Sequence, residues 1–163
     1  MNPVKNQLEF LGDNEIECVI VGGVAATLHG SSLPTTDLDV CYSRAPANLQ
    51  KLATALQSVH ARLRNAPPEL PFILDAETLR SGLNFTLVTD VGDVDLLGEV
   101  PGIGYYDEAL DGASVLKVLG FEFRVIALEK LILAKRTAGR AKDLIAVAEL
   151  EAILESKPTS VDS

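Results

Sequence analysis

The segment VIVGGVAATLHGSSLPTTDLDVCYSR (residues 19–44) decides the fold, because it joins two apolar runs through a pair of glycines. The first run is short and rich in β-branched residues, which predicts a buried strand over residues 15–21. Gly22 and Gly23 end this strand and begin a short helix. Residues 37–43 are predicted to form the next strand. The segment therefore predicts a strand, a helix and a second strand in close succession.

Two aspartates lie one residue apart in the second predicted strand. Residues two apart on a strand point to the same face, so Asp37 and Asp39 project together, with their Cα atoms about 7 Å apart. Their neighbours Leu38, Val40 and Cys41 are apolar, which indicates a mostly buried strand. A half-buried pair of like charges is costly unless a cation neutralises it, and Mg²⁺ is the natural cation for such oxygen ligands. Taken alone, however, Asp-x-Asp more often has a structural role, such as capping a turn or pairing with an arginine.

A second copy of this pattern, in the sequence GDVDLLG, makes a shared metal site the stronger interpretation. Residues 85–89 and 94–97 are predicted to form a hairpin, with residues 90–93 as its turn. If the second strand of the hairpin lies beside the first aspartate pair, Asp95 becomes a third ligand. Asp93 is placed in the turn, where it faces water, and is the fallback ligand. Three carboxylates can hold two metal ions about 4 Å apart, the arrangement used for in-line attack at phosphorus.

The glycine pair and the turn after its helix are candidate phosphate-binding elements. Without side chains at Gly22 and Gly23, backbone N–H groups at the start of the helix can approach an anion. Gly30, Ser31 and Ser32 add a turn with hydroxyl donors. The glycine fingerprints of dinucleotide sites and phosphate loops are absent, so a simple strand-to-helix turn is the alternative. Phosphate donors beside metal ligands favour a nucleoside triphosphate bound through its metal.

The remaining elements follow from apolar periodicity and from glycine and proline positions. Further helices are predicted over residues 3–12, 47–64, 76–82, 128–137 and 142–154. Asp75 is expected to cap the third of these helices, and a second hairpin is expected to turn at Leu119 and Gly120. The order predicts an α+β fold with a mixed, mostly antiparallel sheet flanked by helices. Residues 1–155 are predicted to form a single domain, followed by a flexible tail over residues 156–163.

The two closing helices are predicted to turn charged side chains inward. Lys135 follows three apolar residues at helical spacing, so it shares their face, and Asp143 shares the apolar face of the last helix. An inward lysine can extend along the core to reach solvent, or it can meet a triphosphate, and we favour the second interpretation. Arg140 is expected to pair with Asp143, for which we expect a structural or positioning role. Five of the fourteen basic residues lie between residues 130 and 142, which indicates a local anion site or, more commonly, a solvated helix pair.

The composition excludes several classes of protein. A formal net charge of −9 argues against stable binding of bulk nucleic acid. No apolar run approaches the length of a membrane span, and the N-terminal sequence lacks a secretory signal, so we expect a cytoplasmic protein. Cys18 and Cys41 are expected to be reduced core thiols, with a disulfide or metal pair as the weaker alternative. His29 is expected to be packed or hydrogen-bonded, and His60 to lie on the surface of the 47–64 helix.

Together these motifs resemble those of the DNA polymerase β-like nucleotidyltransferase superfamily. The sequence VGGVAATLHGSS…TTDLDV resembles its first motif, in which a glycine pair is followed by Asp-x-Asp on the next strand. The sequence VDLLGEVPG resembles the strand that carries the third carboxylate. ALEKLILAKRTAGRAKDLIAVAEL resembles the closing helices of small bacterial nucleotidyltransferases related to the AbiEii abortive-infection toxins. The likeness covers about residues 15–154.

The resemblance implies Mg²⁺-dependent transfer of a nucleotidyl group from a nucleoside triphosphate to an acceptor hydroxyl, with release of pyrophosphate. Two Mg²⁺ ions are expected, with Mn²⁺ as a substitute. The implied metal ligands and catalytic residues are Asp37, Asp39 and Asp95. The expected nucleotide-binding residues are Gly22, Gly23, Ser31, Ser32, Lys135 and Arg140. The acceptor is an RNA 3′ end, a protein hydroxyl or a small alcohol such as an antibiotic, and an antitoxin partner is plausible from the family.

The sequence departs from the family in the segment SSLPTTD. Relatives often carry arginine there, whereas this segment has no basic residue, which leaves triphosphate binding to Lys135. The chain also lacks an obvious extra domain for holding a large acceptor. The alternative hypothesis is a non-catalytic module of the same fold that binds a nucleotide or a partner protein. A more remote alternative is a scaffold whose aspartates are all solvated, which requires Asp95 to lie far from Asp37.

Overall fold

The computed structural model describes residues 4–67, 69 and 73–157. The predicted tail, residues 156–163, lies outside this part of the chain except for Ser156 and Lys157, and Ser156 is the last residue of the final helix. No helix in the described residues is long and apolar enough to cross a membrane.

One mixed sheet of seven strands runs through the described part of the chain, in the order β3-β4-β5-β2-β1-β7-β6. The strands are β1 (Cys18–Val21), β2 (Leu38–Tyr42), β3 (Arg62–Leu63), β4 (Asn84–Thr89), β5 (Gly92–Leu97), β6 (Ser114–Val118) and β7 (Phe121–Val125). The β1–β7 and β2–β5 pairs are parallel, and the other four pairs are antiparallel. This arrangement confirms the predicted α+β fold with a mostly antiparallel sheet.

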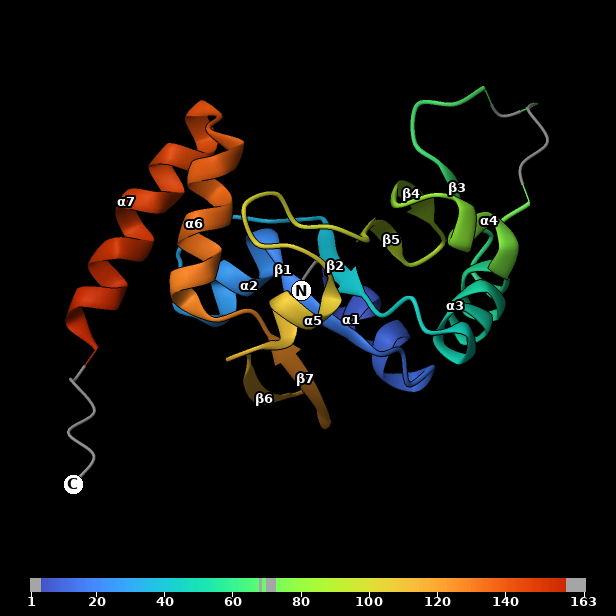
Figure 1. Cartoon of the computed structure of the whole chain (residues 1–163), viewed down its shortest axis with the longest axis horizontal. Coiled ribbons are helices and arrows are strands. Elements are labelled where there is room, and N and C mark those ends of the chain that lie inside the picture. Colours follow the sequence, from blue (N-terminus) through green and yellow to red (C-terminus); the bar gives the residue numbers. More distant parts are fainter. Residues whose placement is uncertain (1–3, 68, 70–72, 158–163) are drawn as a thin grey trace.

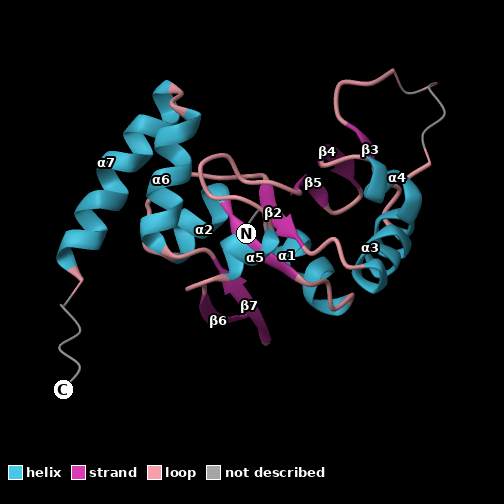
Figure 2. Cartoon of the chain, in the orientation of Figure 1, coloured by secondary structure: helices cyan, strands magenta, loops and turns pink. Residues whose placement is uncertain are grey.

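Helices lie at both ends of the sheet and beside its centre (Figures 1 and 2). They are α1 (Lys5–Asp13), α2 (Gly22–Leu28), α3 (Pro46–Ser58), α4 (Ala76–Ser81), α5 (Tyr106–Leu110), α6 (Leu128–Ala138) and α7 (Ala141–Ser156). Helices α3 and α4 lie at the β3 end, and α6 and α7 pack together next to α2, on the opposite side of the molecule from α3 (Figure 1). As predicted, Asp75 caps α4 by accepting a hydrogen bond of 2.8 Å from the backbone N–H of Thr78.

The core is built around the central strands. Every residue of β1 is buried, which the β-branched run Val19–Val21 predicted. Cys18 and Cys41 are buried free thiols, as expected. His29 is also packed as expected, with its Nε2 atom 2.7 Å from the carbonyl oxygen of Ile126. The second hairpin turns at the predicted position, because β6 ends at Val118 and β7 begins at Phe121.

The helix predicted over residues 47–64 is wrong at its C-terminal end. Helix α3 stops at Ser58, and His60 adopts a positive φ of 52°, which is incompatible with a continuing helix. Residues 62–63 instead form β3 and pair with β4. Leu63 matched the helical period although it packs from a strand, so apolar spacing alone did not locate the boundary. His60 is on the surface, but beyond the helix, and its Nδ1 atom lies 2.5 Å from Asp90.

The first hairpin is tighter than predicted, which changes the position of Asp93. Thr89 pairs with Gly92, so the turn consists of Asp90 and Val91 alone. The Thr89 hydroxyl donates to the Gly92 carbonyl at 2.7 Å and accepts from the Val91 N–H at 3.1 Å, which satisfies the backbone of so short a turn. Asp93 therefore belongs to β5 rather than to the turn. The sequence analysis also missed α5, a helix of only five residues.

Candidate functional site

The two aspartate pairs lie side by side, since Asp93 and Asp95 belong to β5, Asp39 belongs to β2, and Asp37 directly precedes β2. Strands β2 and β5 are parallel, and Asp39 is directly opposite Asp95 in their register. Asp37 and Asp93 lie two residues before these partners, so all four carboxylates belong to one face of the sheet. The strand that carries Asp95 therefore lies beside the first aspartate pair, as a third acidic residue of the site requires. The alternative of a scaffold in which Asp95 lies far from Asp37 is excluded.

One carboxylate oxygen of Asp39, Oδ1, is buried and has no hydrogen-bond partner among the described residues. Burial raises the pKa of Asp39 from 3.8 to about 7, with smaller contributions from Asp95, through its charge and through hydrogen bonding by its carboxyl group, and from the charge of Asp37, while Lys135 opposes the shift. The surroundings of Asp39 therefore disfavour its ionised form unless a cation binds next to it.

Gly22 permits this position of Asp39. Gly22 begins α2 with a φ of +65°, which favours glycine. A Cβ atom at this residue would lie 2.1 Å from Oδ2 of Asp39, closer than any non-bonded contact allows. The glycine of the strand-to-helix corner therefore makes room for a carboxylate, in addition to starting the helix.

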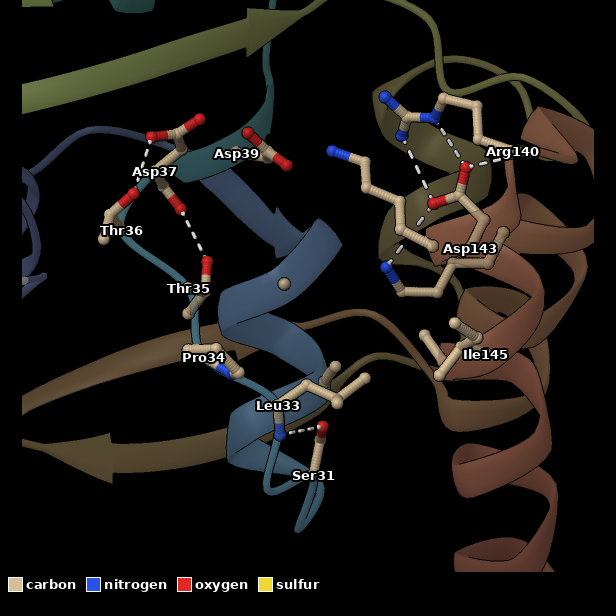
Figure 3. Close-up of a pocket in the computed structure, with 15 residues that line it drawn as sticks. Ser31, Leu33, Pro34, Thr35, Thr36, Asp37, Asp39, Arg140, Asp143 and Ile145 are labelled. Atoms are coloured by element: carbon tan, nitrogen blue, oxygen red, sulfur yellow. Dashed lines mark hydrogen bonds and ion pairs between the residues drawn. The ribbon is translucent and has the colours of Figure 1, made fainter.

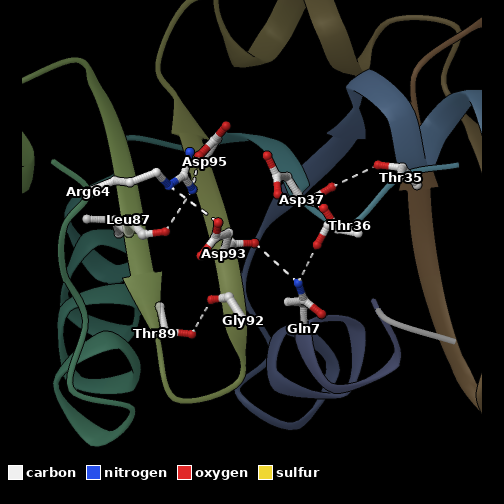
Figure 4. A network of polar contacts seen from close by, with 10 residues as sticks. All are labelled: Gln7, Thr35, Thr36, Asp37, Arg64, Leu87, Thr89, Gly92, Asp93 and Asp95. Atoms are coloured by element: carbon white, nitrogen blue, oxygen red, sulfur yellow. Dashed lines mark hydrogen bonds and ion pairs between the residues drawn. The ribbon is translucent and has the colours of Figure 1, made fainter. Parts of the chain in front are cut away.

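Asp95 already has a cationic partner. Arg64, which follows β3, donates from Nη2 to Oδ1 of Asp95 at 2.9 Å, and its Nε atom lies 3.5 Å from Oδ2 of Asp93. Figure 4 shows Arg64 between these two aspartates, with Asp37 on the opposite side. Within residues 4–67, 69 and 73–157, no three acidic, histidine or cysteine side chains are gathered closely enough to hold a metal ion. Metal binding by all three predicted ligands stays a prediction.

A cavity of about 430 Å³ opens beside Asp37 and Asp39. Its walls are the α2–β2 loop on one side and α6 and α7 on the other (Figure 3). The lining residues are Gly23, Ala26, Ser31, Leu33, Pro34, Thr35, Thr36, Asp37, Asp39, Lys135, Arg140, Lys142, Asp143, Ile145 and Ala146. Acidic and basic groups therefore share the cavity with apolar side chains such as Leu33 and Ile145, which suits a ligand with a charged part and an apolar part.

The inward positions of Lys135 and Asp143 are confirmed. Asp143 is 2% exposed, and Oδ1 of Asp143 lies 4.0 Å from Nζ of Lys135. Arg140 donates to Asp143 from its backbone N–H at 3.2 Å and from Nε at 2.6 Å, which confirms the predicted pair. Burial alone would raise the pKa of Asp143, but the hydrogen bonds and charge of Arg140 hold this pKa below its ordinary value. Asp143 thus contacts both cations that border the cavity.

Burial lowers the pKa of the Lys135 ammonium group, while the charges of Asp143 and Asp39 oppose that shift. The ammonium group of Lys135 thus interacts electrostatically with both carboxylates. It connects the α6–α7 wall electrostatically with the aspartates on the sheet.

The two predicted serine donors are engaged with an acidic residue. The hydroxyl of Ser31 donates to Oε1 of Glu149 at 2.5 Å, and the hydroxyl of Ser32 donates to Oε2 at 2.7 Å. The backbone N–H of Ser32 also donates to Oε2, at 3.0 Å. Glu149, on α7, thus occupies donors that the sequence analysis assigned to phosphate.

The predicted site residues therefore fall into two groups. Those that line the cavity are Gly23, Ser31, Asp37, Asp39, Lys135 and Arg140. Gly22 lies behind Asp39, Ser32 faces Glu149, and Asp95 is held by Arg64. The sequence analysis missed Arg64 and Glu149, because each meets its partners across 23 or more residues of sequence. The sequence analysis placed Arg64 in a helix. A basic residue at the end of a strand could have indicated a partner for the aspartates, but the strand itself was not predicted.

Comparison with known proteins gives structural matches only. No family model matches the sequence, and no curated protein matches it. The solved structure of a candidate nucleotidyltransferase from Thermotoga maritima, TM1012, superimposes with a TM-score of 0.53 at 16% identity, covering 93% of this chain and 92% of that one. The lincosamide antibiotic adenylyltransferase LnuA, solved with bound lincomycin, superimposes with a TM-score of 0.59 at 14% identity, covering 93% of this chain and 96% of that one.

The chain has the nucleotidyltransferase fold. The superpositions include nearly the whole length of both chains, so the shared fold extends beyond the central strands to the helices that form the cavity. Identities of 14–16% establish a likeness of fold, and activity has to be argued from the site.

Proposed function

We propose that this chain is a metal-dependent nucleotidyltransferase, which transfers a nucleoside monophosphate from a nucleoside triphosphate to an acceptor hydroxyl. The observation that carries the proposal is the cavity in which Asp37 and Asp39 face Lys135 and Arg140. Carboxylates that suit a hard divalent cation and cations that suit phosphate oxygens border the same space. A metal-bound triphosphate satisfies both.

The carboxylates fit a divalent cation. The unpartnered Oδ1 of Asp39 and the raised pKa of this residue are the features expected of a ligand without its metal. Asp37 and Asp39 would hold the ion, with Mg²⁺ as the expected metal and Mn²⁺ as its substitute. When bound, the ion neutralises charge on phosphate oxygens and acts as a Lewis acid.

The protein's own groups have separate roles in the transfer. Lys135 and Arg140 would bind and orient the phosphates, and Asp143 keeps both in place. The oxygen of the acceptor hydroxyl forms a bond to the α-phosphorus, the bond from that phosphorus to the pyrophosphate oxygen breaks, and pyrophosphate leaves. Because Arg64 donates to Oδ1 of Asp95, Oδ2 of Asp95 is the oxygen that would accept the proton of the acceptor.

The acceptor that we favour is a small alcohol. LnuA, which has the same fold along nearly its whole length, was solved with lincomycin bound. The formal net charge of −9 gives little electrostatic attraction for an RNA end. An RNA end, a protein hydroxyl and an antitoxin partner of an AbiEii-like toxin stay predictions from the sequence resemblance, as does a cytoplasmic location.

The test is transfer of label from each of the four α-labelled nucleoside triphosphates with Mg²⁺. The acceptors are lincomycin, other antibiotic alcohols and a cell extract, each offered separately. We expect label transfer by the wild-type chain and none by the Asp37→Asn/Asp39→Asn double variant. Equal labelling by the two proteins would overturn the proposal.

A non-catalytic nucleotide-binding module is the second candidate. The ion pair between Arg64 and Asp95 favours it, because this pair engages the carboxylate expected to act as the base. Such a module would bind a nucleoside triphosphate equally well with and without Mg²⁺. Titration calorimetry in the presence and absence of Mg²⁺ separates the candidates, since the enzyme is expected to bind at least tenfold tighter with the metal.

Replacing Glu149 is expected to strengthen nucleotide binding. In Glu149→Gln, an uncharged amide replaces the carboxylate that accepts hydrogen bonds from Ser31 and Ser32. The variant has less negative charge next to the cavity, and its neutral amide competes less well than a carboxylate with phosphate for the Ser31 and Ser32 donors. We therefore expect the dissociation constant of MgATP to fall several-fold. Calorimetry measures it, with Glu155→Gln as a control near the end of the same helix. Weaker binding by Glu149→Gln than by the control would show that the Ser–Glu contact organises the site.

A further inference from the structure

Arg64 is fixed beside the carboxylates by the sheet itself. Its backbone N–H donates to the carbonyl of Thr86 at 2.9 Å, which extends the β3–β4 pairing one residue beyond Leu63. The side chain then reaches across β4, where Nη2 donates to the carbonyl of Leu87 at 2.9 Å and to Asp95 at 2.9 Å. The backbone and the side chain of Arg64 are thus both anchored, and only 22% of the side chain is exposed.

The guanidinium group neutralises one half of the acidic face. Nη2 bonds Asp95, and Nε, which is buried and has no hydrogen bond, lies 3.5 Å from Oδ2 of Asp93. Arginine stays charged at any physiological pH. The aspartates on β5 therefore have a permanent cation before any metal binds, whereas Oδ1 of Asp39 on β2 has no partner.

A second contact fixes the spacing between the two aspartate pairs. Nε2 of Gln7, on α1, donates to the carbonyl of Thr36 at 3.0 Å and to the carbonyl of Asp93 at 3.3 Å. One buried side chain thus joins the backbone just before Asp37 to the backbone of β5. The relative positions of the two pairs are set by the protein, and no bridging metal ion is required to hold them together.

We propose that Arg64 takes the place of a second metal ion, so that the site binds one divalent cation, at Asp37 and Asp39. A second cation at Asp95 would lie against a guanidinium group that is already within hydrogen-bonding distance of the same carboxylate, and like charges at such distances repel strongly. Arg64 is a positioning residue in this arrangement, because it fixes Asp95 and supplies charge without touching the nucleotide. The inference rests on the proposed function and narrows the expected two ions to one.

The experiment counts Mn²⁺ ions bound per chain, by electron paramagnetic resonance of the free ion during titration. We expect one ion for the wild type and one for Asp95→Asn, since Asp95 is not a ligand. Arg64→Leu is expected to bind a second ion, because Asp93 and Asp95 lose their cation. Arg62→Leu, which removes an exposed arginine of β3 two residues before Arg64, is the matched control and should bind one ion.

Two ions on the wild type, or loss of Mn²⁺ binding in Asp95→Asn, would overturn the inference. If Arg64→Leu does not fold, as judged by its circular dichroism, the wild-type and Asp95→Asn counts still decide. Nucleotide transfer by a wild type that binds two ions would reject the role of Arg64 and leave the proposed function intact. A wild type that binds no Mn²⁺ and transfers no label would reject both.

Discussion

Replacing Asp39 by asparagine is expected to lower the rate of nucleotide transfer by about 1,000-fold or more, while the fold is retained. Loss of one group that stabilises transition-state charge typically costs a factor of this order, and here the change also removes a metal ligand. The side chains are nearly equal in size, so packing against Gly22 is preserved. Single-turnover transfer of an α-labelled triphosphate measures the effect.

The control is Asp111→Asn, because the Asp111 side chain is 88% exposed and lies outside the cavity. It should leave the rate unchanged. A rate for Asp39→Asn within tenfold of the wild type would mean that the carboxylate is not part of the reaction.

The same substitution is expected to stabilise the metal-free protein. Because burial and neighbouring carboxylates disfavour the charged form of Asp39, its removal should raise the free energy of unfolding by about 1 kcal/mol at neutral pH. Mg²⁺ should raise the melting temperature of the wild type and leave that of the variant unchanged. A residue kept for its structural contribution would show the opposite, destabilisation on removal, so the two measurements together separate function from structure.

The sequence predicted the parts of the site that depend on local periodicity. The spacing of Asp37 and Asp39 on a strand required no tertiary information, because alternation along a strand is a local property. The inward direction of Lys135 likewise followed from helical spacing. The repeated Asp-x-Asp pattern singled out Asp95, but its position next to the first pair depended on which strands are neighbours, and no local pattern determines that.

The distant partners Arg64 and Glu149 were not predictable in this way. Arg64 and Asp95 are 31 residues apart, and Ser31 and Glu149 are 118 apart. Their meeting depends on the strand order and on the packing of α7, neither of which leaves a local signal. The early end of α3 had the same cause, since the pairing of β3 with β4 competes with helical propensity and prevails.

Gly22→Ala is expected to lower the free energy of unfolding by about 2–5 kcal/mol. Part of this cost, about 1–2 kcal/mol, arises because alanine is strained at a φ of +65°. The rest, about 1–3 kcal/mol, comes from overpacking, since the added methyl group would lie 2.1 Å from Oδ2 of Asp39. Urea denaturation measures the total.

Gly112→Ala separates the two contributions to this cost. Gly112 has a φ of +76°, and a Cβ atom there would meet nothing within 4 Å, so its substitution carries the backbone cost alone. We expect Gly112→Ala to cost about 1–2 kcal/mol, and the excess for Gly22→Ala then measures the contact with Asp39. Equal costs would mean that Gly22 only shapes a turn. A clear excess, together with loss of Mg²⁺-induced stabilisation in Gly22→Ala, would mean that the glycine corner is required for the position of the metal-binding carboxylate.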